Sequence, residues 1–445
     1  MRRGNLVLAS DSPALHTDQY ELGNLQGAIR SGVASRLAVF ELFARRLPEG
    51  RRYGVFAGLG RLLDRLENFR FTADQLCWLN ETQVADADTR GRLEGQHFTG
   101  DVWAYQEGDL YFPNSPLLTV VAPFAEAVLL ETLCLSICNW DSGIASSASR
   151  MVTAARGLPI TEMGSRRTHE EAAIDAARAA YIAGFSATSN MEAGYRYGIP
   201  VTGTAAHCFT MAHRDELTAF RAQVASQGPE TTLLVDTYDL EQGIRNAVAA
   251  AGPELGGVRI DSGDLLSELP KARRLLNSLG ARQARIVLTG GLDEYAMDEL
   301  SLGAAGGFGS GERLIAHPSP GFVYKLVAIA DSDDGEQPLR RVSKRSASKL
   351  SLGGRKWAYR RFDASRFIIA EDLVVSDSAP ESPPVGLPLQ ERVVGEGRIL
   401  LRRSVEEARA FHQQAKCQLS PEQLSIQSGP PAIVARPTRT REESR

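Results

Sequence analysis

The chain has 445 residues, which is too long for one ordinary domain and enough for two or three domains with a large core. Its 43% hydrophobic and 23% charged residues are typical of a folded globular protein. The net charge is -4 and the pI is about 6.1, so no overall positive field attracts nucleic acid or an anionic membrane. We therefore expect neither partner, and any anionic ligand must be held by local arginines.

The cysteines argue against two further classes of protein. There are 5 of them, an odd number without a C-x-x-C pair, which disfavours a disulfide framework and a structural zinc site. Cys134 and Cys138 lie in an apolar helical pattern and are expected to pack in a core. The N-terminal residues lack the apolar segment of a signal peptide, and no run approaches the roughly 18 apolar residues of a membrane span. We expect a cytoplasmic enzyme or binding protein.

The N-terminal region, residues 1–125, has the pattern of a mixed α+β domain. A helix is expected over residues 19–31 and a strand over residues 36–43. A stretch punctuated by glycines follows between Tyr53 and Gly60.

Residues 158–310 alternate short apolar runs with helical patterns, which predicts βα units and a parallel sheet, either doubly wound or closed into a barrel. Ligands of both folds bind beyond the carboxyl ends of the strands, so the residues directly after the runs are candidate site residues. The runs cover residues 158–161, 199–202, 232–235, 257–260 and 285–288, and the segments after them are 163–167, 203–207, 236–239, 261–264 and 289–291.

The first of these segments carries an arginine pair, Arg166 and Arg167. Thr168 and Glu171 have the spacing of a capping box before an alanine-rich helix, which places the pair at a helix N-terminus. Free backbone N–H groups and the helix dipole favour an anion there, so one interpretation is a carboxylate or phosphate site. Two solvated surface arginines are the alternative.

The second segment, Gly203–His207, places small residues and an imidazole directly after an apolar run. A histidine in this position can work on phosphate. A hydrogen-bonded structural histidine is the alternative on this segment alone.

The fourth segment ends a strand in two carboxylates. Arg259 and Asp261 are two residues apart, so both side chains are expected on one face and Ile260 on the other. Asp261 suits a ribose hydroxyl or a magnesium ion, and Asp264 is expected to cap the next helix.

Two glycine-rich turns follow, at residues 289–291 and 306–311. They match neither a Walker A loop nor a dinucleotide fingerprint, and we interpret them as a phosphate nest, with plain tight turns as the alternative. After about residue 325 the chain is rich in strand and loop patterns. Pro, Ser, Arg, Glu and Gln dominate beyond Leu419, so a disordered tail is expected over residues 419–445.

In their order and content, these segments resemble the nicotinate phosphoribosyltransferase family of type II phosphoribosyltransferases. The resemblance spans about residues 15–365. It is carried by Thr17–Tyr20, Phe40–Phe43, Arg46–Pro48, Gly184–Asn190, Gly203–His207, Arg259–Asp264, Gly309–Gly311 and Lys349–Lys356.

The resemblance implies an α/β protein with a (βα) barrel-like domain over residues 126–325. It also implies an α+β domain built from the N-terminal part, 1–125, and the C-terminal part, 326–418. The implied enzyme is a homodimer that joins nicotinate to phosphoribosyl pyrophosphate, giving nicotinate mononucleotide and pyrophosphate in NAD salvage. The reaction uses Mg²⁺ and is coupled to ATP hydrolysis through a phosphohistidine, so it is classed as a ligase.

The resemblance also implies roles for single residues. His207 matches the catalytic histidine that ATP phosphorylates, and Tyr20 matches the aromatic residue at the pyridine ring. The remaining substrate-binding positions are Arg166, Ser189, Thr204, Arg259, Asp261, Gly290, Gly309 and Gly311, with Asp261 also matching a metal position.

The chain departs from the family at three places. Glu312 and Ser147 stand where threonine and lysine are usual, and residues 289–291 replace a more polar turn. Two alternatives follow: a relative that uses nicotinamide or quinolinate, and a catalytically silent nucleotide-binding homologue.

Overall fold

The structure is a computed structural model that describes residues 12–332, 338–344, 352–381 and 385–438. Part of the lysine-rich segment, residues 349–351, lies outside the described residues, as do the first eleven residues. The chain divides into two compact units, residues 1–143 with 319–445, and residues 144–318. The expected boundaries lie near residues 125 and 325, and the observed ones lie at 143 and 318. The observed boundary at residue 143 falls inside helix α6 (Glu131–Ala154), which continues from the first unit into the second.

The first unit contains an antiparallel sheet of 7 strands in the order β13-β12-β1-β5-β3-β17-β18. Strand β1 pairs with β12, and β3 pairs with β17, so the strands from the N-terminal part form the centre of the sheet and strands from the C-terminal part flank them on both sides. This confirms the expected α+β domain built from the two ends of the chain. The strands are β1 (Leu37–Ala44), β3 (Asp101–Tyr105), β5 (Leu118–Pro123), β12 (Phe322–Ile329), β13 (Arg340–Arg341), β17 (Gln390–Gly395) and β18 (Arg398–Ile399).

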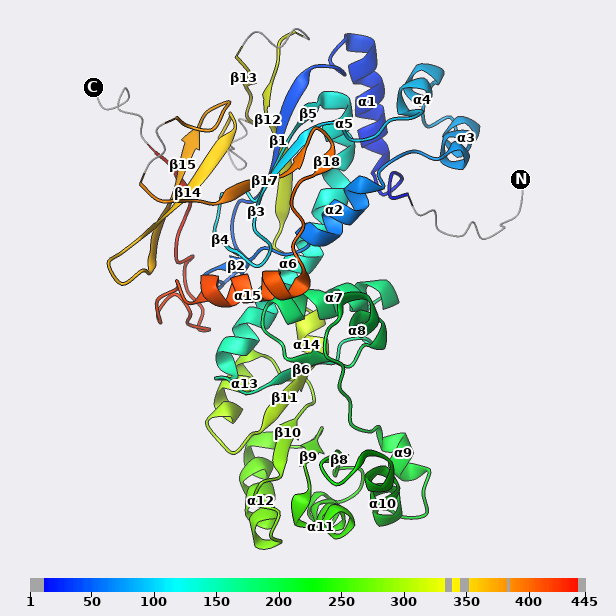
Figure 1. The fold of residues 1–445 in the computed structure, drawn as a ribbon, viewed down its shortest axis with the longest axis vertical. Coiled ribbons are helices and arrows are strands. Elements are labelled where there is room, and N and C mark those ends of the chain that lie inside the picture. Colours follow the sequence, from blue (N-terminus) through cyan, green and yellow to red (C-terminus); the bar gives the residue numbers. More distant parts are fainter. Residues whose placement is uncertain (1–11, 333–337, 345–351, 382–384, 439–445) are drawn as a thin grey trace. The chain divides into compact units, whose positions relative to one another are not determined.

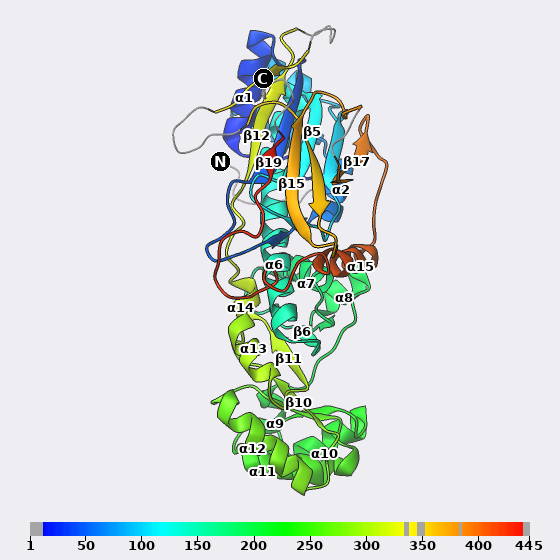
Figure 2. The same cartoon turned by 90° about the vertical axis from the view of Figure 1, so that its left-hand side faces the viewer.

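Helices cover one side of this sheet, and a smaller sheet lies on its other side (Figures 1 and 2). The predicted helix is confirmed as α1 (Gln19–Ser31), which ends where Gly32 adopts a φ of 74°. Because both sides are covered, every residue of β1 after Leu37 is buried. The other helical segments of the unit are α2 (Leu59–Glu67), α3 (Ala73–Glu81), α4 (Ala87–Leu93), α5 (Phe124–Ala127), η1 (Val128–Leu130) and α15 (Val405–Lys416).

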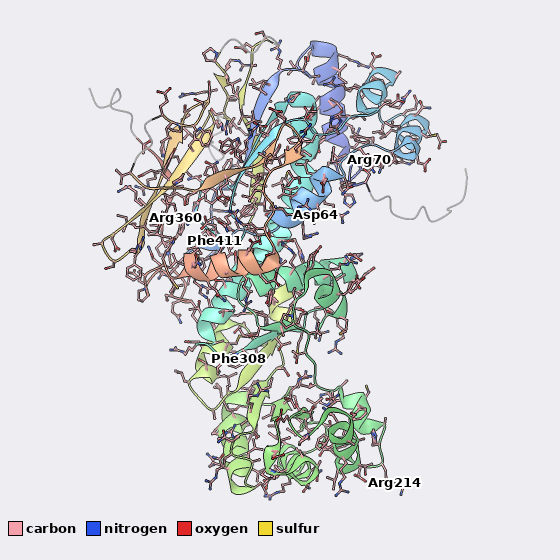
Figure 3. The ribbon with its side chains drawn as sticks, in the orientation of Figure 1. Asp64, Arg70, Arg214, Phe308, Arg360 and Phe411 are labelled. Carbon is pink, nitrogen blue, oxygen red and sulfur yellow. The ribbon has the colours of Figure 1, made fainter. Side chains whose placement is uncertain are left out.

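A buried charge cluster joins the smaller sheet to Asp109 and, through the Tyr105 hydroxyl that donates to Glu371 at 2.8 Å, to β3 of the large sheet. The strand order of the smaller sheet is β16-β14-β15-β19, with β14 at Lys356–Phe362, β15 at Ile368–Val375, β16 at Leu387–Pro388 and β19 at Arg436–Pro437. Arg360 of β14 donates to Asp109 at 2.6 Å and lies 3.4 Å from Glu371 of β15 (Figure 3). Asp109 precedes β4 (Leu110–Tyr111), which pairs with β2 (Gly54–Val55). A buried arginine needs such partners to remain charged.

The predicted disordered tail is wrong for residues 419–438. Leu419, Ile426, Ile433 and Ala435 are buried there, and β19 pairs with β15. Polar residues and proline dominate this segment, and its few apolar residues are far apart in the sequence, so its composition is typical of a disordered segment. Residues 439–445 lie outside the described residues.

The second unit contains a parallel sheet of 6 strands in the order β7-β6-β11-β10-β9-β8, which forms a half-barrel (Figure 1). It confirms the predicted α/β architecture. The strands are β6 (Ile160–Glu162), β7 (Ala187–Thr188), β8 (Thr232–Leu234), β9 (Gly257–Ile260), β10 (Arg285–Leu288) and β11 (Gly307–Ser310). Its helical segments are α7 (Glu170–Ile182), α8 (Met191–Tyr197), α9 (His207–Met211), α10 (Glu216–Gln227), α11 (Leu240–Ala251), η2 (Gly252–Glu254), α12 (Leu265–Ser278), α13 (Glu294–Ser301) and α14 (Glu312–Ile315).

Two strand predictions in this unit need correction. The run at residues 199–202 forms only an isolated bridge, between Val201 and Thr188, and the strand at this edge is β7. The glycine-rich segment after residue 306 is not a turn but strand β11, which lies between β6 and β10 and carries the buried Phe308 (Figure 3). Glycines weaken a strand, so the local sequence of this segment favours a turn.

The described helices include none that is both long and apolar enough to span a bilayer. Cys134 and Cys138 are buried on α6, as predicted, and all five cysteines are free thiols.

Candidate active site

Arg259 joins three of the predicted strand-end segments. It lies on β9, and its Nε donates to Thr289 Oγ1 at 2.9 Å, beyond the end of β10. One Nη donates to Thr204 Oγ1 at 3.1 Å, and the other donates to Asp261 Oδ1 at 2.8 Å. Ile260 between them is fully buried on the opposite face, as the two-residue spacing predicts. The parallel sheet therefore brings three segments to one point.

Asp261 is an ionised carboxylate at this point. It accepts hydrogen bonds from Arg259 and from the Thr289 hydroxyl. Burial raises the pKa of Asp261, but the hydrogen bond from Thr289 and the charge of Arg259 outweigh it, so this pKa lies below its ordinary value. Its second oxygen lies 3.9 Å from Nε2 of His207.

His207 is the first residue of α9 and has a defined ring orientation. Its Nδ1 lies 3.1 Å from Thr237 Oγ1, in the segment after β8. The side chain is 38% exposed, and its Nε2 faces the Asp261 carboxylate at 3.9 Å. Thr237 belongs to a predicted strand-end segment, but nothing in its sequence context marks it as the partner of the histidine.

Asp236 completes the group of acidic side chains. Its Oδ2 accepts from the backbone N–H of Asp261 at 2.9 Å and from the Ser262 hydroxyl at 2.6 Å. Its Oδ1 is buried and has no hydrogen-bond partner among the described residues. The part of the chain that the structure describes contains no group of three or more His, Cys, Asp or Glu side chains that could hold a metal ion. This donor set fits Mg²⁺, which commonly takes one or two carboxylates and completes its shell with substrate phosphates and water.

The side chain of Glu162, the last residue of β6, fixes the turn that follows this strand. This buried carboxylate accepts from Thr188 at 2.6 Å and from the backbone N–H of Gly164. Burial raises the pKa of Glu162, although both hydrogen bonds lower it. Asn190 donates to Ser165 at 2.9 Å, which ties the same turn to the segment after β7.

The two arginines of this turn differ in their surroundings. Arg166 is exposed and makes no hydrogen bond or ion pair with any residue within the described ranges. Arg167 lies 3.5 Å from Glu312, and both side chains are more than half exposed. The predicted cap at Thr168 is wrong: α7 begins at Glu170, and His169 accepts the capping hydrogen bond from Glu171. The pair therefore stands on a turn before the helix, not on its N-terminus.

The glycines of the site have packing roles. Gly290 has a φ of 101°, and a Cβ there would lie 2.2 Å from the carbonyl oxygen of Asp261. A Cβ on Gly309 would meet Thr289 and Met163 at 2.6 and 2.7 Å, and one on Gly311 would meet the Met163 carbonyl at 2.5 Å. A side chain at Gly309 would push β11 away from Met163 and Thr289, and side chains at Gly290 and Gly311 would clash with the backbone of Asp261 and Met163.

The remaining predicted residues lie further apart. Ser189 is exposed after β7, where its backbone N–H donates to the carbonyl of Glu162 at 2.8 Å. Asp264 precedes α12, but its side chain makes no capping hydrogen bond, contrary to the prediction. Tyr20 belongs to the first unit, on α1, and is 46% exposed.

The fold and this group of residues define an α/β protein in which a histidine stands beside an arginine–carboxylate pair at the carboxyl ends of parallel strands. Family models for the nicotinate phosphoribosyltransferase N-terminal domain and the nicotinate phosphoribosyltransferase family match residues 15–139 and 158–329. The chain belongs to the nicotinate phosphoribosyltransferase family.

Individual relatives agree with this assignment. The chain is 49% identical to nicotinate phosphoribosyltransferase pncB1 of Mycobacterium tuberculosis, over 97% of this chain and 96% of that protein. It is 41% identical to the nicotinate phosphoribosyltransferase of Bacillus subtilis, over 80% and 74% of the two chains. The crystal structure of human nicotinic acid phosphoribosyltransferase superimposes with a TM-score of 0.80 at 26% identity, over 94% of this chain and 97% of that one.

Proposed function

We propose that the protein is a nicotinate phosphoribosyltransferase that forms nicotinate mononucleotide and pyrophosphate from nicotinate and phosphoribosyl pyrophosphate, in NAD salvage. The observation that carries the proposal is the link from Arg259 to Thr204 and Asp261, with the Asp261 carboxylate 3.9 Å from Nε2 of His207. The names of the relatives support the same reaction.

His207 is the proposed acceptor of the γ-phosphoryl group of ATP. With Nδ1–H donating to Thr237, the lone pair of Nε2 attacks phosphorus, and the bond from phosphorus to the departing ADP oxygen breaks. The ring then carries a positive charge, which the Asp261 carboxylate 3.9 Å away stabilises. In this proposed step Nδ1 is hydrogen-bonded to Thr237, and Nε2 accepts the phosphoryl group.

Arginines and carboxylates serve the transfer step. The pyridine nitrogen of nicotinate bonds to the anomeric carbon, and the bond from this carbon to pyrophosphate breaks. Arg166, which has no partner among the described residues, is the proposed contact of an anionic group of the substrates. Asp261 and the free oxygen of Asp236 are the proposed ligands of Mg²⁺, which when bound stabilises the charge of the leaving pyrophosphate.

We further propose a homodimer in the cytoplasm. Met191, Tyr195 and Val201 are 71%, 87% and 46% exposed in the second unit, and a partner subunit would cover such apolar side chains. Five free thiols suit a reducing compartment.

One assay tests the proposal and its alternatives. Purified protein with phosphoribosyl pyrophosphate and Mg²⁺ is given nicotinate, nicotinamide or quinolinate, with and without ATP. We expect nicotinate mononucleotide, formed faster with ATP. The nicotinamide or quinolinate product would identify the related activities, and no mononucleotide under any condition would support a silent homologue. His207→Ala should abolish acid-labile labelling by γ-phosphate-labelled ATP and leave slow turnover without ATP.

A further inference from the structure

Thr289 directly follows β10 and is held by the strands on both sides. Strand β10 lies between β9 and β11 (Figure 1). The backbone N–H of Thr289 donates to the carbonyl of Ile260 on β9 at 3.0 Å. Its methyl group takes the space that a side chain of Gly309 on β11 would need, because a Cβ there would lie 2.6 Å from the methyl carbon. Threonine is branched at Cβ and this side chain is buried, so these contacts fix the direction of its hydroxyl.

The hydroxyl of Thr289 connects Arg259 to Asp261. Nε of Arg259 donates to Thr289 Oγ1 at 2.9 Å. A guanidinium has no acceptor, so the hydroxyl must accept here, and its own proton is left for another partner. Oδ1 of Asp261 accepts this second hydrogen bond, whereas the carbonyl of Ile260 lies 3.5 Å away, at the limit for one. The hydrogen bonds therefore run in one direction, from Arg259 through Thr289 to Asp261.

These hydrogen bonds occupy one oxygen of the Asp261 carboxylate and leave the other. Oδ1 accepts from Nη2 of Arg259 at 2.8 Å as well as from Thr289, so it has two donors. Oδ2 accepts no hydrogen bond from any residue that the structure describes, and it lies 3.9 Å from Nε2 of His207. Hydrogen bonds from two side chains make the carboxylate rigid, so Oδ2 stays turned toward the imidazole.

We infer that Thr289 is a positioning residue that turns the second oxygen of Asp261 toward His207 and thereby speeds phosphorylation of this histidine. The inference rests on the proposed function, because it takes His207 as the acceptor of the γ-phosphoryl group. The ring becomes positively charged when Nε2 bonds to phosphorus and the bond from phosphorus to the ADP oxygen breaks. The attraction between this charge and Asp261 weakens with distance, so a carboxylate that can rotate away stabilises the charge less.

The rate of phosphohistidine formation in the full-length protein tests this inference, measured by rapid quenching with labelled ATP and saturating Mg²⁺. Thr289→Val keeps the methyl contact and loses the hydroxyl, so it should slow phosphorylation roughly fivefold, which corresponds to about 1 kcal/mol for one hydrogen bond. The ATP concentration that gives half of the maximal rate should stay unchanged. Thr289→Ser keeps the hydroxyl and should restore most of the rate. If Thr289→Val does not fold, Thr289→Ala removes the same hydroxyl with a smaller side chain and should show the same loss.

A double-mutant cycle with Asp261→Asn shows whether Thr289 acts through the charge of Asp261. Once this charge is absent, Thr289→Val should slow phosphorylation no further. Thr119→Val is the matched control, because Thr119 is a buried threonine on β5 of the first unit, and its hydroxyl accepts from Gln390 at 3.2 Å. This control also removes a buried hydroxyl, and it should leave the rate of phosphorylation unchanged even if it lowers the melting temperature.

An unaltered rate in Thr289→Val would overturn the inference, as would a rate in Thr289→Ser as low as that of Thr289→Val. Losses that multiply in the double variant would also overturn it, and an equal loss in Thr119→Val would trace the effect to general stability. If ATP labels the unaltered protein and one of these results appears, the inference alone fails. If ATP does not label the unaltered protein, the proposed phosphohistidine fails and the inference falls with it.

Discussion

Replacing Asp261 by asparagine tests whether the carboxylate beside His207 assists phosphorylation of this histidine. Asparagine has nearly the same shape and can still accept hydrogen bonds from Arg259 and Thr289. The substitution therefore removes the negative charge and preserves most of the local geometry. Because Asp261 is also a proposed Mg²⁺ ligand, the rates are compared at Mg²⁺ concentrations that saturate each variant, and the remaining effect on phosphorylation should be electrostatic.

The size of this effect follows from the distance between Asp261 Oδ2 and His207 Nε2, which is 3.9 Å. Two unit charges at this distance interact by about 4 kcal/mol at an effective dielectric constant of 20, and by about 1 kcal/mol in bulk water. The side chains are 38% and 32% exposed, so solvent screening brings the value between these limits. A loss of about 2 kcal/mol corresponds to a roughly 30-fold slower phosphorylation.

The assay is the half-reaction with labelled ATP and Mg²⁺, without nicotinate or phosphoribosyl pyrophosphate. Rapid quenching under alkaline conditions preserves phosphohistidine and gives the rate of its formation. Asp264→Asn is the matched control, because Asp264 loses the same charge three residues away and its side chain is exposed without a capping bond. If Asp261→Asn is phosphorylated at the unaltered rate, the Asp261 charge does not assist the reaction. If Asp264→Asn slows phosphorylation equally, the effect is not specific to the carboxylate beside His207.

Three other substitutions have defined outcomes. Arg166→Ala should raise the KM of the anionic substrate that it contacts about 10-fold. It should leave the melting temperature unchanged, because the exposed side chain makes no hydrogen bond or ion pair with described residues. An equal loss of stability would indicate a structural role. Glu312→Thr should free Arg167 and lower the KM for phosphoribosyl pyrophosphate severalfold. The stability should change little, because the ion pair of Arg167 with Glu312 is exposed. If the KM and its dependence on salt concentration stay unchanged, Glu312 does not affect binding of this substrate. Glu162→Gln should stabilise the protein at neutral pH, as measured by urea unfolding across pH. Because burial raises the pKa of Glu162, the folded state binds the proton more tightly than the unfolded chain, so stability falls as the pH rises from the ordinary value through the raised one. A pH profile identical to that of the unaltered protein would contradict this reasoning.

The sequence predicted those parts of the site that depend on a general rule of parallel sheets. Thr204, His207 and Asp261 follow strands or apolar runs, Arg259 lies near the end of β9, and the carboxyl ends of parallel strands meet at one edge. The side chains of Arg259 and Asp261 share a face because they are two residues apart. Neither prediction required knowledge of tertiary contacts beyond the sheet itself.

Contacts between segments distant in sequence could not be predicted in this way. Gly309 was interpreted as part of a phosphate-binding turn, whereas it lies in a strand whose closeness to Met163 and Thr289 excludes a side chain. Local patterns show that a glycine is flexible, but not that a neighbour needs its space. The ion pair of Lys325 with Glu131 illustrates the same limit: the two residues are 194 positions apart in the sequence, and the pairing of β12 with β1 brings the cation to the start of α6. An ion pair between distant segments therefore leaves no signal in the local sequence of either residue, and it is found only when the fold brings the two residues together.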